Sequence, residues 1–217
     1  DVLKTKNKYD SFGLHAYGAY APVDRVNLIG TLSWMHNSSD ITQSINAAGF
    51  NKADADVKTN LFSLGARAEA NLPVGKANVI PHAGLRYVWA KSGSYDTKVD
   101  GKKVWGNTPD ATNTFQLPIG VAVRGDIMTV SGWNVRPQAD LTFIPQFGDT
   151  EQKTKLSNFN GVSDKLSGEF AGKFGTSVNL GVQADKGPTT FGVRYGFTAG
   201  TKGKADHAFK FEYRYRF

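Results

Sequence analysis

Residues Phe209–Phe217 read FKFEYRYRF, and this stretch decides the fold. Its five aromatic residues alternate without exception with four charged ones. A helix would scatter these aromatics around its circumference, whereas a β-strand points successive side chains to opposite faces. The stretch therefore predicts a strand with one aromatic face and one charged face.

The same period of two recurs upstream, where apolar residues again alternate with polar ones. Together with the last stretch, these segments predict nine strands. The eight upstream segments are Phe12–Tyr20, Val26–Trp34, Leu64–Leu72, Val79–Trp89, Phe115–Val123, Trp133–Phe147, Phe174–Gln183 and Phe191–Phe197.

The connections between these strands alternate in length, as in a meander. Short turns are predicted at Pro22–Arg25, Leu72–Lys76, Gly125–Gly132 and Asp185–Pro188. The opposite connections are long polar loops at His36–Val57, Ala90–Asn113 and Gly148–Ser167, with a shorter one at Ala199–Ala205. Short turns at one end and long loops at the other are typical of outer-membrane β-barrels. We find no linker or composition shift, so residues 1–217 are predicted to form a single domain.

Composition excludes several other classes of protein. No run approaches the roughly 18 apolar residues of a membrane-spanning helix, and the mean hydropathy is −0.37. A transmembrane barrel also has a low mean, because lumen-facing residues dilute its lipid face. The chain lacks cysteine, which removes disulfides and thiol chemistry. The net charge of +7 includes no basic run longer than a pair, so we expect no nucleic-acid partner.

The charged face distinguishes a barrel from a soluble sandwich, which would also alternate. An unpaired charge in a dry core costs several kcal/mol; this face is therefore predicted to line a wet lumen. The apolar face, with aromatics near strand ends, would then meet lipid. The predicted lumen-lining residues are Arg67, Glu69, Arg86, Arg124, Arg136, Asp140, Glu169, Lys173, Arg194, Lys210, Glu212, Arg214 and Arg216. Their excess of five positive charges favours an acidic or polar occupant, the alternative being a lattice of ion pairs across the wall.

Four segments carry a resemblance to a known family. Tyr9–Gly18 (YDSFGLHAYG), Val135–Leu141 (VRPQADL), Gly192–Phe197 (GVRYGF) and Glu212–Phe217 (EYRYRF) resemble strands of autotransporter translocator domains in sequence and in order. The resemblance covers essentially the whole chain. It implies an all-β, antiparallel, up-and-down transmembrane β-barrel of about twelve strands in the bacterial outer membrane. An N-terminal passenger would cross to the cell surface, and a helix would thread the lumen.

This sequence departs from that pattern. Nine strands that end on the periplasmic side would begin on the outside, whereas such barrels are even-stranded and begin inside. We therefore expect about three further strands, the lumenal helix and the passenger to lie upstream of Asp1. No passenger-cleavage residues can be assigned in this chain.

The resemblance implies a function without chemistry: membrane anchoring and export of the chain's own passenger. The implied partners are outer-membrane lipid, the passenger segment and the barrel assembly machinery. The machinery would recognise the terminal residues Phe209, Phe211, Tyr213, Tyr215 and Phe217. The alternatives are an adhesin or pore that acts through its long external loops, and a soluble lipid-binding β-protein.

Catalytic and metal chemistry finds little support in the sequence. The four histidines, His15, His36, His82 and His207, show no ligand spacing, so no metal and no cofactor are expected. A surface protease built from Asp and His could use His36 with Asp40, or Asp206 with His207. Adjacent strand residues point to opposite faces, which argues against the second pair, and we expect no enzyme.

Overall fold

The structure is a computed structural model that describes residues 3–47, 50–158, 161–169, 172–201 and 205–216. Nearly all of these residues lie in β-strands, and within these ranges there is no α-helix. Correspondingly, the described part of the chain offers no helix of the length and apolarity needed to cross a membrane. The strands are β1 (Leu3–Val23), β2 (Val26–Ala47), β3 (Phe50–Ala70), β4 (Leu72–Val74), β5 (Ala77–Ser92), β6 (Tyr95–Val99), β7 (Lys102–Pro109), β8 (Thr112–Gln116), β9 (Ile119–Gly125), β10 (Ile127–Met128), β11 (Asn134–Gly148), β12 (Glu151–Asn158), β13 (Ser163–Glu169), β14 (Phe174–Lys186), β15 (Thr189–Gly200) and β16 (Ala205–Tyr215).

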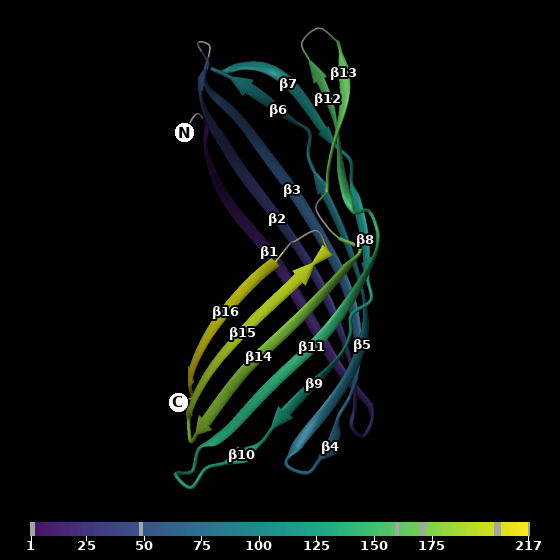
Figure 1. Cartoon of the computed structure of the whole chain (residues 1–217), viewed down its shortest axis with the longest axis vertical. Coiled ribbons are helices and arrows are strands. Elements are labelled where there is room, and N and C mark those ends of the chain that lie inside the picture. The colour runs from purple at the N-terminus through teal and green to yellow at the C-terminus, as the bar shows by residue number, and fades with distance from the viewer. Residues whose placement is uncertain (1–2, 48–49, 159–160, 170–171, 202–204, 217) are drawn as a thin grey trace.

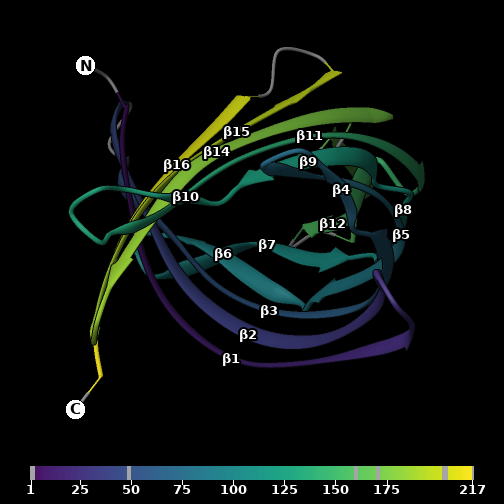
Figure 2. The same cartoon turned by 90° about the horizontal axis from the view of Figure 1, so that it is seen from below.

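All of these strands belong to one antiparallel sheet. Its main wall runs β1-β2-β3-β5-β9-β11-β14-β15-β16, with β8 continuing β9 beyond a break that contains Pro118, which has no N–H to donate. Figure 1 shows these strands running obliquely, and Figure 2 shows the wall curling round on itself. Among the described residues, β1 pairs only with β2 and β16 only with β15.

The predicted all-β meander is confirmed, and each of the nine predicted strands corresponds to one crossing of the wall. The four short turns also lie where the sequence predicted them. The first is the tight β1–β2 hairpin, where Val23 pairs with Val26 and Arg25 has a φ of 68°. β4 and β10 lie beside these turns, at the lower end of Figure 1.

The three predicted long loops are wrong. β2 and β3 continue as a paired ribbon through most of His36–Val57, β6 and β7 form a hairpin within Ala90–Asn113, and β12 and β13 form another within Gly148–Ser167. These segments are mostly polar, so any alternation in hydropathy along them is short and weak although their backbones pair. They extend the same sheet by a branch, β3-β6-β7-β12-β13, at the upper end of the wall (Figure 1).

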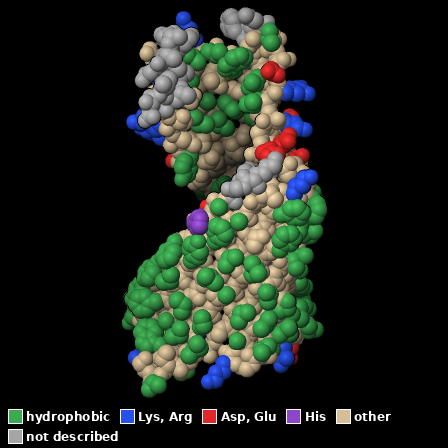
Figure 3. All heavy atoms as spheres, viewed as in Figure 1, with side chains coloured by type: hydrophobic (Ala, Val, Ile, Leu, Met, Phe, Trp, Pro, Cys, Tyr) green, Lys and Arg blue, Asp and Glu red, His purple; other side chains and the backbone are tan. Residues whose placement is uncertain are grey.

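The register divides the wall into two faces, which we call outer and inner. On the outer face one row of paired residues joins Val79, Val123, Ala139, Leu180, Tyr195 and Phe209 across the wall. Figure 3 shows hydrophobic side chains covering this face of the lower wall. The curl of the wall in Figure 2 encloses the inner face. The register places on this face the alternate residues of the same strands, such as Arg124, Gln138 and Arg194. Most large outer residues are exposed, Leu180 by 49%, because no other part of the described chain covers them.

Candidate functional site

The inner face holds ten of the predicted lumen-lining residues on wall strands: Arg67, Glu69, Arg86, Arg124, Arg136, Asp140, Arg194, Lys210, Glu212 and Arg214. Three lie elsewhere. Glu169 is on β13, opposite Glu151, in a hairpin that the sequence did not predict. Lys173 precedes β14, and Arg216 follows β16, with its backbone N–H still bonded to the Pro188 carbonyl.

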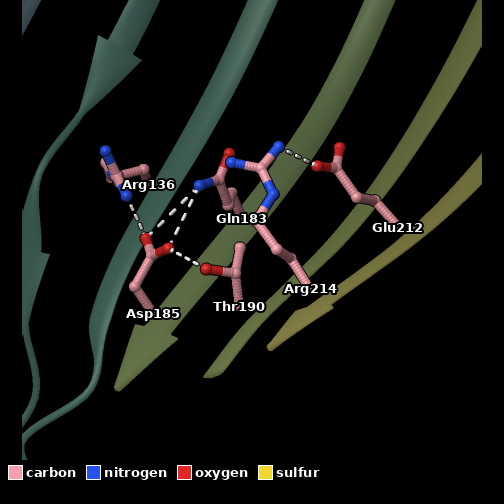
Figure 4. Close-up of polar contacts among 6 residues, drawn as sticks. All are labelled: Arg136, Gln183, Asp185, Thr190, Glu212 and Arg214. Carbon is pink, nitrogen blue, oxygen red and sulfur yellow. Dashed lines mark hydrogen bonds and ion pairs between the residues drawn. The ribbon is translucent and has the colours of Figure 1, made fainter. Parts of the chain in front are cut away.

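A polar cluster lies at the short-turn end of the inner face (Figure 4). The Asp185 carboxylate pairs with Arg136 and accepts a hydrogen bond of 2.7 Å from the Thr190 hydroxyl and one of 3.2 Å from the Gln183 amide. On β16, which is separated from β14 by β15, Arg214 forms an ion pair of 2.8 Å with Glu212. The sequence assigned Asp185 to a turn and so missed the acid at the centre of this cluster.

A second polar link crosses the middle of the wall. The His82 ring, almost fully buried, lies 3.0 Å from the Asp140 carboxylate, which also accepts a 2.6 Å hydrogen bond from Thr142. His82 is on β5 and Asp140 on β11, so the ring must pass over β9, where Gly120 lies. A Cβ at Gly120 would lie 2.7 Å from the His82 ring. Glycine is therefore required here for the close approach of a side chain.

Glu69, the third acidic residue predicted on the inner face of the wall strands, also has a basic partner. Glu69 forms an ion pair of 3.2 Å with Arg67, two residues away on the same strand. Arg86, which has no acidic partner among the described residues, donates a 3.0 Å hydrogen bond to the Ser63 hydroxyl. The four acids Glu69, Asp140, Asp185 and Glu212 are thus all engaged by neighbouring side chains.

A third group of residues lacks such partners. Arg124, Gln138, Arg194 and Lys210 follow one another in a single register row from β9 to β16, with Gly181 between Gln138 and Arg194. No carboxylate of the described chain forms an ion pair with Arg124, Arg194 or Lys210. All four residues line one cavity of about 470 Å³, together with Arg67 and Asp140.

Aromatic residues mark the two ends of the apolar outer face. Near the short turns, Phe191 packs between Trp133 and Tyr213, with ring centroids 6.1 and 5.2 Å apart. Near the other end, Phe143 stacks on Phe174 at 5.7 Å. The predicted signal residues Phe209, Phe211, Tyr213 and Tyr215 lie on β16, and Phe217 lies outside the described residues.

The two Asp–His pairs that the sequence offered as an alternative are not assembled. Asp206 and His207 point to opposite faces of β16, and the His207 ring instead lies 2.8 Å from the Tyr195 hydroxyl. His36 lies 2.9 Å from Asn60 rather than beside Asp40. The described residues contain no group of three or more His, Asp or Glu side chains placed to hold a metal ion.

The family profile described as "Autotransporter beta-domain" matches residues 1–196. The chain belongs to this family. No curated protein matches it. Among solved structures it is similar to the β-domain of the Bordetella autotransporter BrkA, with a TM-score of 0.67 and 18% identity over 97% of this chain and 75% of that one. It is equally similar to the translocator domain of NalP from Neisseria meningitidis, with a TM-score of 0.67 and 20% identity over 98% of this chain and 69% of that one.

Membership of the autotransporter β-domain family distinguishes between the functions that the sequence alone left open. The autotransporter β-domain is a translocator family and not a family of enzymes. The antiparallel fold agrees with that of the solved β-domains. The chain therefore has the role of an outer-membrane translocator, and the adhesin or pore is not favoured.

Proposed function

We propose that residues 1–217 act as one translocator domain that anchors in the outer membrane and gives its own passenger a route to the cell surface. The observation that carries the proposal is the division of the wall into an apolar outer face and a charged inner face. Hydrocarbon accepts only a wall whose outward side chains are apolar. An ionic inner face requires water or a polar occupant.

The dimensions of the outer face fit a membrane. On β14 the outward residues run from Phe174 to Lys186, a span of 13 residues. At about 3.4 Å per residue and a tilt of about 45°, this span covers about 29 Å along the membrane normal. That is close to the thickness of a hydrocarbon core. Lys186, whose ammonium lies 5.9 Å from the centre of the Trp133 ring, would then reach the head-group region.

Orientation can be tested with single cysteines, because the chain contains no native cysteine. Ser163→Cys places a thiol on the β12–β13 hairpin, and Ser131→Cys places one in the turn between β10 and β11. We expect a membrane-impermeant maleimide to label the Ser163→Cys variant on intact cells. The Ser131→Cys variant should react only after the outer membrane is permeabilised. Equal labelling of both variants on intact cells, or recovery of the chain in a soluble fraction, would contradict the proposal.

We also propose that the aromatic terminal strand is recognised by the barrel assembly machinery. The support is that, among the described residues, β16 pairs with β15 alone and so forms one edge of the sheet, and recognition by strand addition uses such an edge. Its aromatics Phe209, Phe211 and Tyr213 are 75%, 64% and 57% exposed. They would also contact lipid, so the two roles must be separated.

To separate recognition by the machinery from contact with lipid, the assembly of each variant in cells is compared with its folding into lipid vesicles. Phe217→Ala and Tyr215→Ala should lower the amount of folded protein in the outer membrane several-fold. The same variants should fold like the unmodified chain into lipid vesicles without the machinery. If the losses are equal in cells and in vesicles, the residues act only as lipid anchors. Phe191→Ala, an outward aromatic on the neighbouring strand, serves as the matched control.

A further inference from the structure

The cationic row on the inner face is not neutralised by its own wall. Arg194 and Lys210 lie directly opposite one another on β15 and β16, a position where like charges destabilise a sheet. A lattice of ion pairs would have placed a carboxylate at one of these positions. Glu69, Asp140, Asp185 and Glu212 are instead held by Arg67, His82, Arg136 and Arg214, respectively. Asp206, four residues along β16 from Lys210, also faces inward, but no ion pair joins it to the row.

The close packing around Gly181 holds Arg194 and Gln138 at the cavity. Gly181 separates Gln138 from Arg194 in the row, and a Cβ at Gly181 would lie 2.8 Å from the Gln138 amide nitrogen and 3.1 Å from Arg194 Cγ. The stem of Arg194 therefore lies over Gly181, toward Gln138. This arrangement leaves the guanidinium and the Gln138 amide as donors on one side of the same cavity.

We propose that Arg124, Arg194 and Lys210, with Gln138, bind the carboxylates of an acidic peptide segment that occupies the bore. This inference rests on the proposed translocator function and specifies the chemistry of the occupant. Arg124 and Lys210 are four strand steps apart, about 19 Å along the wall at about 4.8 Å per step. A single small anion cannot contact all three cations over that span, whereas a peptide with several carboxylates can. Guanidinium groups also suit carboxylates because they donate two parallel hydrogen bonds.

The test measures the binding of a labelled decaglutamate peptide to the whole chain folded in detergent, by fluorescence anisotropy. The variant Arg124→Gln/Arg194→Gln/Lys210→Gln removes the row. The control Arg136→Gln/Arg214→Gln/Lys155→Gln removes the same net charge from two paired cations and from one on the β12–β13 hairpin. We expect the row variant to weaken Kd at least thirtyfold and the control to change it less than threefold.

Two results would overturn the inference: an equal loss in both variants, or binding of decalysine as tight as that of decaglutamate. Displacement of the peptide by millimolar inorganic phosphate at constant ionic strength would also overturn it, because the row would then be a general anion site. The proposed function fails separately, if the unmodified chain does not insert in the outer membrane. A difference in gel mobility between unheated and heated samples, as folded barrels give, would show that both variants still fold.

Discussion

The division of faces makes a quantitative prediction for adjacent residues on β14. Leu180 is the middle residue of the outward series from Phe174 to Lys186, so it lies near the middle of the membrane in the proposed orientation. Asn179 precedes it and points to the inner face, where it donates a 3.1 Å hydrogen bond to Ser177. The same substitution, to Lys, can thus be made on both faces at nearly the same depth.

The expected loss of unfolding free energy depends on the medium that the new lysine meets on each face of the wall. No residue of the described chain covers Leu180, which is 49% exposed and lies between Ala139 and Tyr195 in the register. Lipid must therefore receive the ammonium of Leu180→Lys, at a cost of about 2–4 kcal/mol near the bilayer midplane. At about 1.4 kcal/mol per factor of ten, the folding equilibrium constant falls by a factor of about 30 to 700. The ammonium of Asn179→Lys remains in the polar bore beside Asp140, and its cost should be below about 1 kcal/mol.

Both variants can be unfolded with guanidinium after folding into lipid vesicles, with tryptophan fluorescence as the signal. We expect a clear loss of unfolding free energy for Leu180→Lys and almost none for Asn179→Lys. A change of Leu180 to Ala, which alters size without adding charge, separates the loss of apolar contact from the charge effect. If Asn179→Lys were as damaging as Leu180→Lys, the assignment of faces would be wrong and the membrane orientation with it.

Three further substitutions test individual features, each in guanidinium unfolding unless stated. Gly120→Ala should cost about 1–3 kcal/mol, because its Cβ would lie 2.4 Å from the Leu141 carbonyl oxygen; Gly18→Ala, with no atom within 4 Å, should be neutral, and equal effects would refute the close approach. Asp185→Asn should cost about 1 kcal/mol, since its partner Arg136 is half exposed, and less in high salt; an equal loss for Asp206→Asn would contradict a specific role for the cluster. Gly101→Val should speed amide hydrogen exchange in β6 and β7 alone, because φ is 80° at Gly101; a loss of stability in the whole wall would show that the hairpin is not an independent extension.

The wall could be predicted from the sequence because its two faces differ in polarity, as the proposed membrane orientation requires. Wherever lipid lies on one side and polar groups on the other, the side chains must alternate, as Phe209, Phe211 and Tyr213 do with their charged neighbours. The same alternation assigned Arg124, Arg194 and Lys210 to the inner face. It could not say which charges pair, because pairing depends on register between strands far apart in the sequence. The contact between His82 and Asp140, 58 residues apart, is of this kind.

The upper hairpins were not predicted, because hydropathy alternates clearly only in strands whose two faces meet different surroundings. A strand without that difference still pairs its backbone but leaves no such pattern in the sequence. β6 and β7 are short and carry few apolar residues, so they resemble loops in composition. A local signal was nevertheless present. Asp100-Gly101 is a dipeptide typical of two-residue hairpin turns, and both residues have positive φ, 47° and 80°. Val99 pairs with Lys102 around it. Turn chemistry, rather than hydropathy, would have identified this hairpin.

In the proposed orientation, the length of the first strands indicates where the membrane would end. β2 has 22 residues, which at about 3.3 Å each and a tilt of about 45° rise about 50 Å along the normal, far more than a hydrocarbon core of about 30 Å. Part of β2 must therefore stand in water, and the outer face shows where. One outward row joins Leu14, Trp34 and Phe62, whereas a row six residues further up joins Lys8, Asp40 and Asp56. The backbone ladder continues across this change without a break. The change from aromatic to charged residues on a continuous strand is what a wall crossing from hydrocarbon into water requires, and a sheet wholly inside a soluble protein has no reason to place it there.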